Sequence, residues 1–199
     1  MNQFVPANTI EQFFHIRKNA LSPEVCQRAI ELFEQSEHKV EGKVGDGTRS
    51  GAYRPDIKST TEIMLNEHTD EWGEVLEAIV ANLKSELKSY LDRFPNIIHV
   101  PIYPEEFRIA KYDIGGIFDW HSDNIGSDIT RVITAIWYLN DVPEGGETHY
   151  LLQGVKVKPE QGKMMLCPVG WPFVHKGEAP VSNPKYMIIT QLHQKVDNP

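Results

Sequence analysis

Two polar residues in the second half of the sequence have the types and spacing of a ligand pair. His121 and Asp123 stand two positions apart in the stretch FDWHSDNIG, residues 118–126, soon after the glycine pair Gly115 and Gly116. If this stretch is extended, its residues at i and i+2 project from one face, so an imidazole and a carboxylate share one space. Such a pair can hold a metal ion or a proton, although a pair on a plain surface strand has the same spacing.

A second histidine favours the metal ion. His175 ends a short apolar segment, FVH, and in an all-β fold strands this far apart in the sequence can face each other. Two histidines and one carboxylate on one side of a metal leave positions open, an arrangement typical of non-haem Fe(II) and oxygen chemistry. Fe²⁺ with two neutral imidazoles and one carboxylate keeps a positive charge, which favours an anionic chelating ligand.

A lysine beyond this histidine is suited to hold the same anion. In the segment KYMIITQL, a strand places Lys185, Met187, Ile189 and Gln191 on one mostly apolar face. An unpaired buried ammonium group is costly, so a lysine at the start of an inward face requires an anionic partner. A lysine that extends to the rim of the fold needs none. A dicarboxylate bound to the metal at one end provides the partner at the other.

From about residue 98 the sequence is typical of short strands joined by turns. Eight segments have this pattern: IIHVPIY, EEFRIAKY, RVITAIWYL, THYLL, GVKVKP, GKMMLC, FVH and KYMIITQL. Short strands without intervening helices predict a β-sandwich or β-barrel, of which a jelly roll is the economical solution. We therefore predict a mainly β protein with its jelly-roll core at about residues 96–195.

Two amphipathic helices are predicted before these strands. The segment LSPEVCQRAIELFEQ has Ser22 as N-cap and Pro23 at the first helical position. The segment TDEWGEVLEAIVANLKSELKSYLDRF carries apolar residues on one face, as a helix packed on a core does. Together they predict a helical support at about residues 8–95. With the jelly roll it forms one domain over residues 1–199.

The segment between the helices, residues 38–54, is rich in glycine and lacks apolar periodicity. A long loop of this kind inside a compact domain is more often functional than idle. We therefore expect this segment to form a lid over the site, with Arg49, Tyr53 and Arg54 as contacts to the substrate.

Composition disfavours several classes of partner. The net charge of −8 disfavours nucleic acid and anionic membranes. The longest apolar run, VITAIWYL, is too short to span a bilayer, and the first residues lack the pattern of a signal peptide. Cys26 and Cys167 are far apart and suggest no disulfide framework. We expect a cytoplasmic protein that binds neither nucleic acid nor membrane; the sequence indicates no oligomeric state.

Four motifs follow one another between about residues 105 and 193. The stretch YDIGGIFDWHSD has the pattern Tyr-x-x-Gly-x-x-Phe-x-x-His-x-Asp, and it is followed by RVITAIWYLND with EGGETHY, by VKPEQGKMMLC, and by the stretch from His175 to Lys185. In this order the motifs resemble the Fe(II)- and 2-oxoglutarate-dependent dioxygenases of the prolyl 4-hydroxylase type. The resemblance extends weakly to the first predicted helix.

The resemblance implies roles for five residues. It implies Fe(II) at His121, Asp123 and His175, the distal carboxylate of 2-oxoglutarate at Lys185, and a hydrogen bond to 2-oxoglutarate from Tyr112. It implies a double-stranded β-helix, a cupin-like fold that agrees with the jelly roll predicted from the strands. The implied reaction uses O₂ to hydroxylate an unactivated C–H bond of a small molecule or peptide, such as a prolyl residue in a peptide or an amino acid.

Two departures from the family pattern bear on the substrate. Gln191 stands where prolyl hydroxylases often carry tryptophan, and His149 follows GGET where phenylalanine is more usual. A proline substrate is therefore an open question, whereas the cofactor chemistry is not affected. We expect His149, Trp137 and Trp171 to line the substrate side of the site.

Three other classes of protein stay open. A non-catalytic jelly-roll module that binds a metal or ligand is disfavoured because all three ligands and the lysine are present. A nucleic-acid repair oxygenase of the same chemistry is disfavoured by the negative charge and the lack of a basic patch. A structural zinc site prefers four closed ligands, often with thiolates among them.

Overall fold

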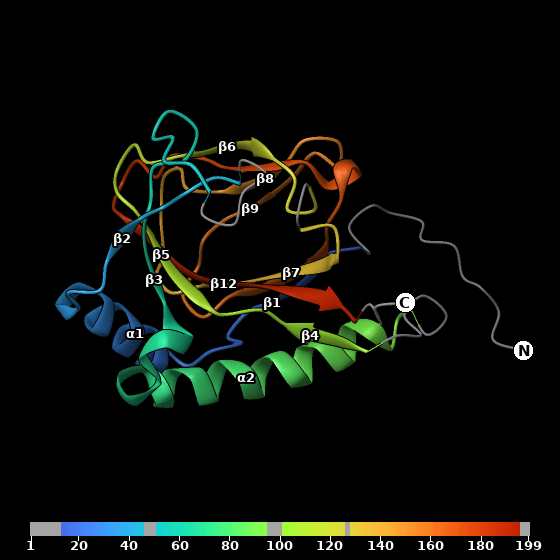
Figure 1. Ribbon diagram of the computed structural model, residues 1–199, viewed down its shortest axis with the longest axis horizontal. Helices are drawn as coiled ribbons and strands as arrows, with labels where there is room; N and C mark the ends of the chain where they lie inside the picture. The colour runs from blue at the N-terminus through green and yellow to red at the C-terminus, as the bar shows by residue number, and fades with distance from the viewer. Residues whose placement is uncertain (1–12, 46–50, 95–100, 126–127, 196–199) are drawn as a thin grey trace, which may run out of the picture.

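The computed structural model describes residues 13–45, 51–94, 101–125 and 128–195, whose strands form two antiparallel sheets (Figure 1). The larger sheet contains, in spatial order, β1 (His15–Arg17), β10 (Met164–Pro168), β7 (Arg131–Tyr138), β12 (Lys185–Gln194), β5 (Arg108–Tyr112), β3 (Thr61–Met64) and β2 (Val40–Glu41), with β4 (Ile102–Pro104) paired to β12. The smaller sheet contains β6 (Phe118–His121), β11 (His175–Gly177), β8 (Thr148–Tyr150) and β9 (Val155–Val157).

The two sheets face each other across an apolar core. Figure 1 shows the smaller sheet, with β6, β8 and β9, above the strands of the larger one. Tyr138, Met187 and Ile189 of the larger sheet pack in this core with Tyr150 and Val157 of the smaller sheet. Two antiparallel sheets packed in this way form a jelly roll, so the predicted mainly β fold is confirmed.

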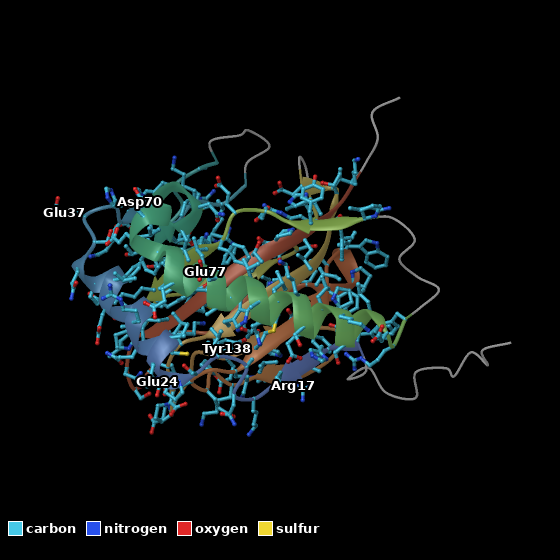
Figure 2. All side chains as sticks on the ribbon, turned by 90° about the horizontal axis from the view of Figure 1, so that it is seen from below. Arg17, Glu24, Glu37, Asp70, Glu77 and Tyr138 are labelled. Carbon is cyan, nitrogen blue, oxygen red and sulfur yellow. The ribbon has the colours of Figure 1, made fainter. Side chains whose placement is uncertain are left out.

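Two helices cover the outer face of the larger sheet. Helix α1 (Pro23–Gln35) begins after Ser22, whose Oγ accepts a hydrogen bond from Val25 N (3.4 Å). Helix α2 (Thr69–Leu91) runs along the sheet, and Figure 2 shows it crossing the strands. Its Trp72 is fully buried. Both helices are present where the sequence predicts them. Among the described residues, no helix is long and apolar enough to cross a membrane.

The larger sheet is buried on both faces, which explains the long apolar runs in its central strands. On β7, Trp137 faces the helices, whereas Ile136 and Tyr138 face the space between the sheets. The indole Nε1 of Trp137 donates a hydrogen bond to Asn82 Oδ1 on α2 (2.8 Å), and Asn82 Nδ2 donates another to Ala20 O (2.8 Å). Strand alternation thus separates a face that holds the helices from a face that lines the barrel.

Several boundaries differ from the predicted ones. The eight predicted segments do not include the short strands β1, β2 and β3, nor β6. In the segment FVH the prediction is wrong, because Trp171–Phe173 form a 3₁₀ turn and the strand begins only at His175. A proline in this turn cannot donate a ladder hydrogen bond, which delays the strand. Of the segment IIHVPIY, residues 97–100 lie outside the described residues, and the strand there begins at Ile102.

The glycine-rich segment 38–54 is partly strand. Val40 and Glu41 form β2 and pair with β3. Val44 and Ala52 exchange two backbone hydrogen bonds, of 2.9 and 2.8 Å. Residues 46–50, which include the predicted substrate contact Arg49, lie outside the described residues. Closure of this segment over the site stays a prediction.

We expect Asn82→Ala to lower the free energy of unfolding by about 1–3 kcal/mol, because the buried indole N–H of Trp137 loses its acceptor. Urea denaturation followed by circular dichroism measures the change. Glu77→Ala, at an exposed position of the same helix (Figure 2), is the control and should change stability by less than about 0.5 kcal/mol. Equal effects of the two substitutions would contradict a specific role for the Asn82–Trp137 contact.

Candidate metal centre

Two neighbouring strands of the smaller sheet bring the predicted ligands together. In the antiparallel pair β6–β11, His121 lies directly opposite His175, and the centroids of their rings are 4.2 Å apart. Asp123 follows two residues after the end of β6. Its Oδ1 is 3.5 Å from His121 Nε2, and its Oδ2 is 3.8 Å from His175 Nε2. One ligand atom from each residue can be chosen so that all three lie within 4.8 Å of one another.

Hydrogen bonds on the far side of each imidazole leave one nitrogen free to act as a ligand. His121 Nδ1 is 2.7 Å from Asp119 O, and His175 Nδ1 is 3.1 Å from Phe173 O. A carbonyl oxygen can only accept, so these contacts assign the proton to Nδ1 and the lone pair to Nε2. Each Nε2 faces Asp123. Backbone carbonyls orient metal-binding histidines in the same way.

Burial and neighbouring groups set the ionisation states that a cation requires. Burial, with His121 nearby, lowers the pKa of His175 to about 4, so its imidazole is neutral at neutral pH. Burial by itself raises the pKa of Asp123, but His175, His121 and Thr134 outweigh this effect and hold the pKa well below its usual value. Thr134 Oγ1 donates a hydrogen bond of 2.5 Å to Asp123 Oδ2. The result is a carboxylate beside the neutral imidazole of His175.

Tyr150 holds His175 from behind. The two residues are register partners on β8 and β11, and their rings stack with centroids 4.9 Å apart. The hydroxyl oxygen of Tyr150 lies 2.7 Å from Cys167 Sγ, and both side chains are buried. Burial raises the pKa of Cys167 to about 12. The imidazole of His175 therefore rests on a rigid, uncharged layer.

The three side chains line one cavity, together with Lys185 and Tyr112. Lys185 is fully buried and is the register partner of Tyr112 on β5. Its Nζ donates a hydrogen bond to Gly146 O (3.0 Å) and lies 4.0 Å from the centroid of the Tyr112 ring. The predicted inward orientation of Lys185 is thus what the structure shows.

Lys185 has no carboxylate in an ion pair with it among the described residues. Burial lowers its pKa to about 7, and the charges of Glu147 and Glu178 offset only part of this effect. A buried ammonium group without a counter-ion is unfavourable, so this end of the cavity is suited to an anion. Gly177 packs closely against this end of the cavity, because a Cβ there would stand 3.2 Å from Tyr112 Cε1 and 3.6 Å from Lys185 Nζ.

Trp137 and Trp171 do not join this cavity. Trp137 is fully buried on the helix side of the sheet, because odd-numbered residues of β7 face away from the barrel. Trp171 is 79% exposed. His149, on the outer face of β8, has its Nδ1 3.0 Å from Glu178 Oε1 and its ring against Trp120.

Two of the predicted lid contacts, Tyr53 and Arg54, also lie apart from the cavity lining, as does Arg131. Tyr53 is exposed, and Arg54 forms two hydrogen bonds to the carboxylate of Asp56, of 2.9 and 2.7 Å. Arg131 pairs with Glu105 (2.9 Å) and with Asp128 (2.8 Å).

Five polar residues that the sequence did not single out line the cavity: Lys58, Glu62, Arg108, Thr134 and Thr148. The sequence could have indicated that Arg108 and Thr134 line the cavity, because strand alternation puts them on the same faces as Tyr112 and Ile136. The sequence gives no such indication for Lys58 and Glu62, because they lie on either side of the start of β3, a strand of four residues that is too short to show alternation. Gln191, noted as a departure from the family pattern, lines the cavity as well.

The sequence motifs and this geometry agree with a family assignment. Residues 107–193 match the model of the 2OG-Fe(II) oxygenase superfamily. The matched segment covers less than half of the chain. It contains all five residues to which the resemblance assigns a role at the metal or the cosubstrate. The helices and the strands before residue 107 lie outside the match.

Individual proteins similar to this chain are prolyl hydroxylases. Prolyl 4-hydroxylase 13 of Arabidopsis thaliana is 34% identical over 120 residues, which are 49% of this chain and 40% of the plant protein. The chain thus spans less than half the length of this relative.

Solved structures share the fold at low sequence identity. A prolyl hydroxylase from Trichoplax adhaerens, in complex with a hypoxia inducible factor peptide fragment, has a TM-score of 0.72 at 19% identity and covers 92% of this chain and 84% of its own. A Pseudomonas putida prolyl-4-hydroxylase has a TM-score of 0.69 at 16% identity and covers 92% and 93%. A viral collagen prolyl hydroxylase from Paramecium Bursaria Chlorella virus-1, solved as a 2OG complex, has a TM-score of 0.66 at 19% identity and covers 92% and 97%.

We expect His121→Ala, Asp123→Ala and His175→Ala each to lower the affinity for a divalent transition metal by more than about 100-fold, since loss of a ligand exceeds the effect of losing its supporting hydrogen bond. Anaerobic titration with Co²⁺ measures this affinity, and circular dichroism checks the fold. His149→Ala is the matched control, because this histidine lies outside the cluster. Retention of full metal affinity by any of the three variants would remove that residue from the ligand set.

Proposed function

We propose that this protein is an Fe(II)- and 2-oxoglutarate-dependent dioxygenase that hydroxylates an unactivated C–H bond. One observation carries the proposal. A single cavity contains a two-histidine, one-carboxylate cluster and, separately, a fully buried lysine that forms no ion pair among the described residues. A chelating dicarboxylate fits both features, since one end binds the metal and the other binds the lysine.

The donor set fits ferrous iron. His121, His175 and Asp123 would hold a ferrous ion with three ligands, and three ligands from the protein would leave positions for a chelating cosubstrate and O₂. A closed structural zinc site needs a fourth ligand. The two cysteines, the usual soft ligands of such sites, are not part of the cluster: Cys26 packs with the helices, and Cys167 lies behind Tyr150.

The cluster and the lysine both adjoin strand β11. His175 begins this strand, and Gly177, two residues later, adjoins Lys185 Nζ. A short dicarboxylate has one carboxylate for each of these two places. Tyr112, whose ring contacts Lys185, has its pKa raised by burial and so presents a neutral O–H as a donor. These contacts support the assignment of 2-oxoglutarate to this space.

Bound iron, 2-oxoglutarate and O₂ supply the oxidising equivalents that convert a C–H bond into an alcohol, with 2-oxoglutarate released as succinate and CO₂. The chain's own residues hold and shield these groups. Lys185 neutralises the far carboxylate, and Thr134 fixes the orientation of the Asp123 carboxylate. Phe118, stacked on His121 with centroids 3.5 Å apart, joins Ile136 in excluding water from the cavity.

Two buried thiols support the expected cytoplasmic location. Cys26 and Cys167 are both free and buried, and neither has a disulfide partner. Small proteins of oxidising compartments commonly depend on disulfides, whereas thiols persist where the medium is reducing. A cytoplasmic setting is therefore part of the proposal.

An anaerobic titration tests the proposed function. Addition of Fe(II) and then 2-oxoglutarate should produce a weak visible charge-transfer band, and admission of O₂ should then release succinate. A non-catalytic binding module or a zinc site should produce neither signal. Absence of both the band and succinate in protein that binds iron would overturn the proposal.

The same band tests the role of Lys185. We expect Lys185→Met to raise the 2-oxoglutarate concentration at half-saturation by about 30-fold or more, because loss of one partner from a desolvated charge pair costs about 2–5 kcal/mol. Lys163→Met is the control. It removes another buried lysine, which pairs with Glu160 at 2.7 Å and does not line the cavity. Should Lys185→Met leave the midpoint unchanged while Arg131→Ala abolishes the band, the anion site lies at Arg131 instead.

Affinity for 2-oxoglutarate should fall as the pH rises above about 7. Without the anion, burial lowers the pKa of Lys185 to about 7, and a bound carboxylate raises it because it favours the charged form. Below this pH the lysine is already charged and affinity is flat. Above it, affinity falls by up to about tenfold per pH unit until the pKa of the complex is reached. In Lys185→Arg the guanidinium stays charged, so its weaker binding should not vary over this range. A wild-type affinity that is constant from about pH 6 to about pH 9 would contradict a titrating lysine.

A further inference from the structure

A second group of polar side chains lines the cavity beyond the metal cluster. Along β12 the inward residues after Lys185 are Met187, Ile189 and Gln191, and Gln191 is the register partner of Thr134, which donates to Asp123. On β5, Arg108 is the register partner of Ile189. Arg108 and Gln191 therefore lie at the end of these strands that is remote from Lys185.

Arg108 is a cation without an ion-pair partner in the described part of the chain. Its Nε is buried and has no hydrogen-bond partner there. The carboxylates that act on it, those of Glu62, Glu105 and Asp123, raise its pKa from a distance. Arg108 is thus charged at neutral pH and its fork of N–H donors is incompletely used.

Each of those three carboxylates already has closer partners. Glu62 Oε1 is 2.7 Å from Lys58 Nζ and accepts a hydrogen bond from Thr60 Oγ1 (3.0 Å). Glu105 pairs with Arg131 at 2.9 Å, and Asp123 belongs to the metal cluster. The protein therefore supplies Arg108 with a favourable field but no direct counter-ion. A carboxylate from outside would complete it, and the planar guanidinium is shaped to bind a carboxylate through two hydrogen bonds.

Whereas Arg108 Nε lacks an acceptor among the described residues, Gln191 lacks a hydrogen-bond donor there. Its side chain is 2% exposed, and its Oε1 is buried without a hydrogen-bond donor among the described residues. A buried amide oxygen without a donor costs about 1–3 kcal/mol, so such groups in native proteins have a specific reason to persist. The oxygen can only accept, and the group it lacks is an N–H or O–H.

The two incomplete groups are close enough to hold one small molecule. Arg108 is the register partner of Ile189, and Gln191 follows Ile189 by two residues on the same face of β12. Gln191 therefore lies diagonally opposite Arg108, a position at which long side chains can meet. We propose that Arg108 and Gln191 form the substrate site, and that the substrate is a free amino acid. Its carboxylate binds Arg108 and its amino group donates to Gln191 Oε1. The inference rests on the proposed function, because it assigns 2-oxoglutarate to Lys185 and leaves Arg108 for the substrate.

A residue inside a peptide fits these groups less well. Its carboxyl group is an amide, which leaves the positive charge of Arg108 without an anion. Lys58 and Glu62, both almost fully buried, add an internal ion pair to the wall of the cavity. A charged wall of this kind suits a small zwitterion.

The test compares amino acids with their uncharged derivatives on the metal-loaded protein. Each of the common L-amino acids and its carboxamide is added to protein with Fe(II), 2-oxoglutarate and O₂, and succinate release is measured. Calorimetry on the Co²⁺ and 2-oxoglutarate form measures binding independently of turnover. We expect at least one amino acid to raise succinate release above the rate without substrate. Its carboxamide should bind at least about tenfold more weakly, because the charged hydrogen bond is lost.

Variants assign the effect to residues. Arg108→Met should weaken the amino acid by about 30-fold or more, and Gln191→Leu by about tenfold, while 2-oxoglutarate affinity changes less than about twofold. Arg108→Lys, which keeps the charge, should retain part of the binding and covers the case in which Arg108→Met does not fold. Lys111→Met is the matched control on the same strand, since Lys111 pairs with Glu34 at 2.9 Å and does not line the cavity. It should bind the amino acid like the wild type.

Three results would overturn the inference. One is loss of 2-oxoglutarate binding in Arg108→Met, which would place Arg108 in the cosubstrate site. Another is stimulation by a proline-rich peptide with blocked ends that persists in Arg108→Met. The third is a charge-transfer band with 2-oxoglutarate but no binding of any amino acid, which would leave the proposed function intact. If wild-type protein shows neither band nor succinate, the proposed function fails and this inference fails with it.

Discussion

Burial of the larger sheet on both faces is the constraint on which the rest of the structure depends. The helices remove one face from water, and the smaller sheet removes the other. Because successive residues of a strand point to opposite faces, the apolar core that stabilises the fold and the groups that build the site can be supplied by the same strands. On β12, Ile188 and Leu192 pack under the helices, while Lys185 and Gln191 line the cavity.

This arrangement places several charged side chains in the wall of a cavity that has an environment of low polarity. Two cationic groups, Lys185 and Arg108, line the cavity together with the cluster of His121, Asp123 and His175. Neither cation has an ion-pair partner among the described residues, and both are held on strands of a rigid sheet. In a medium of low polarity such groups discriminate strongly between anions that reach them and molecules that do not.

The sequence allowed the fold class and both helices to be predicted, because each depends on local periodicity. Its motifs also singled out His121, Asp123, His175 and Lys185, which the structure brings to one cavity. The short strands β1, β2 and β3 could not be predicted, since two to four residues carry too little periodicity and their pairing is fixed by distant strands. The assignment of Trp137 to the substrate side was wrong, although the sequence contains the information to place it. Alternation along β7 puts Trp137 on the face of the strand opposite to that of Ile136 and Tyr138. The ion pair of Lys58 and Glu62 arises from packing and was not visible in the sequence.

The contact between Tyr150 and Cys167 has a consequence for the durability of the protein. Thiolates, rather than thiols, are the forms that oxidants and electrophiles attack. With its pKa raised to about 12 by burial, Cys167 stays a thiol at any physiological pH, although only Tyr150 separates it from His175. A thiolate this close to a centre proposed to bind iron and oxygen would be oxidised readily. Because Cys167 lies behind the ring of Tyr150, the protein can use a cysteine in its core close to a site proposed for oxidative chemistry.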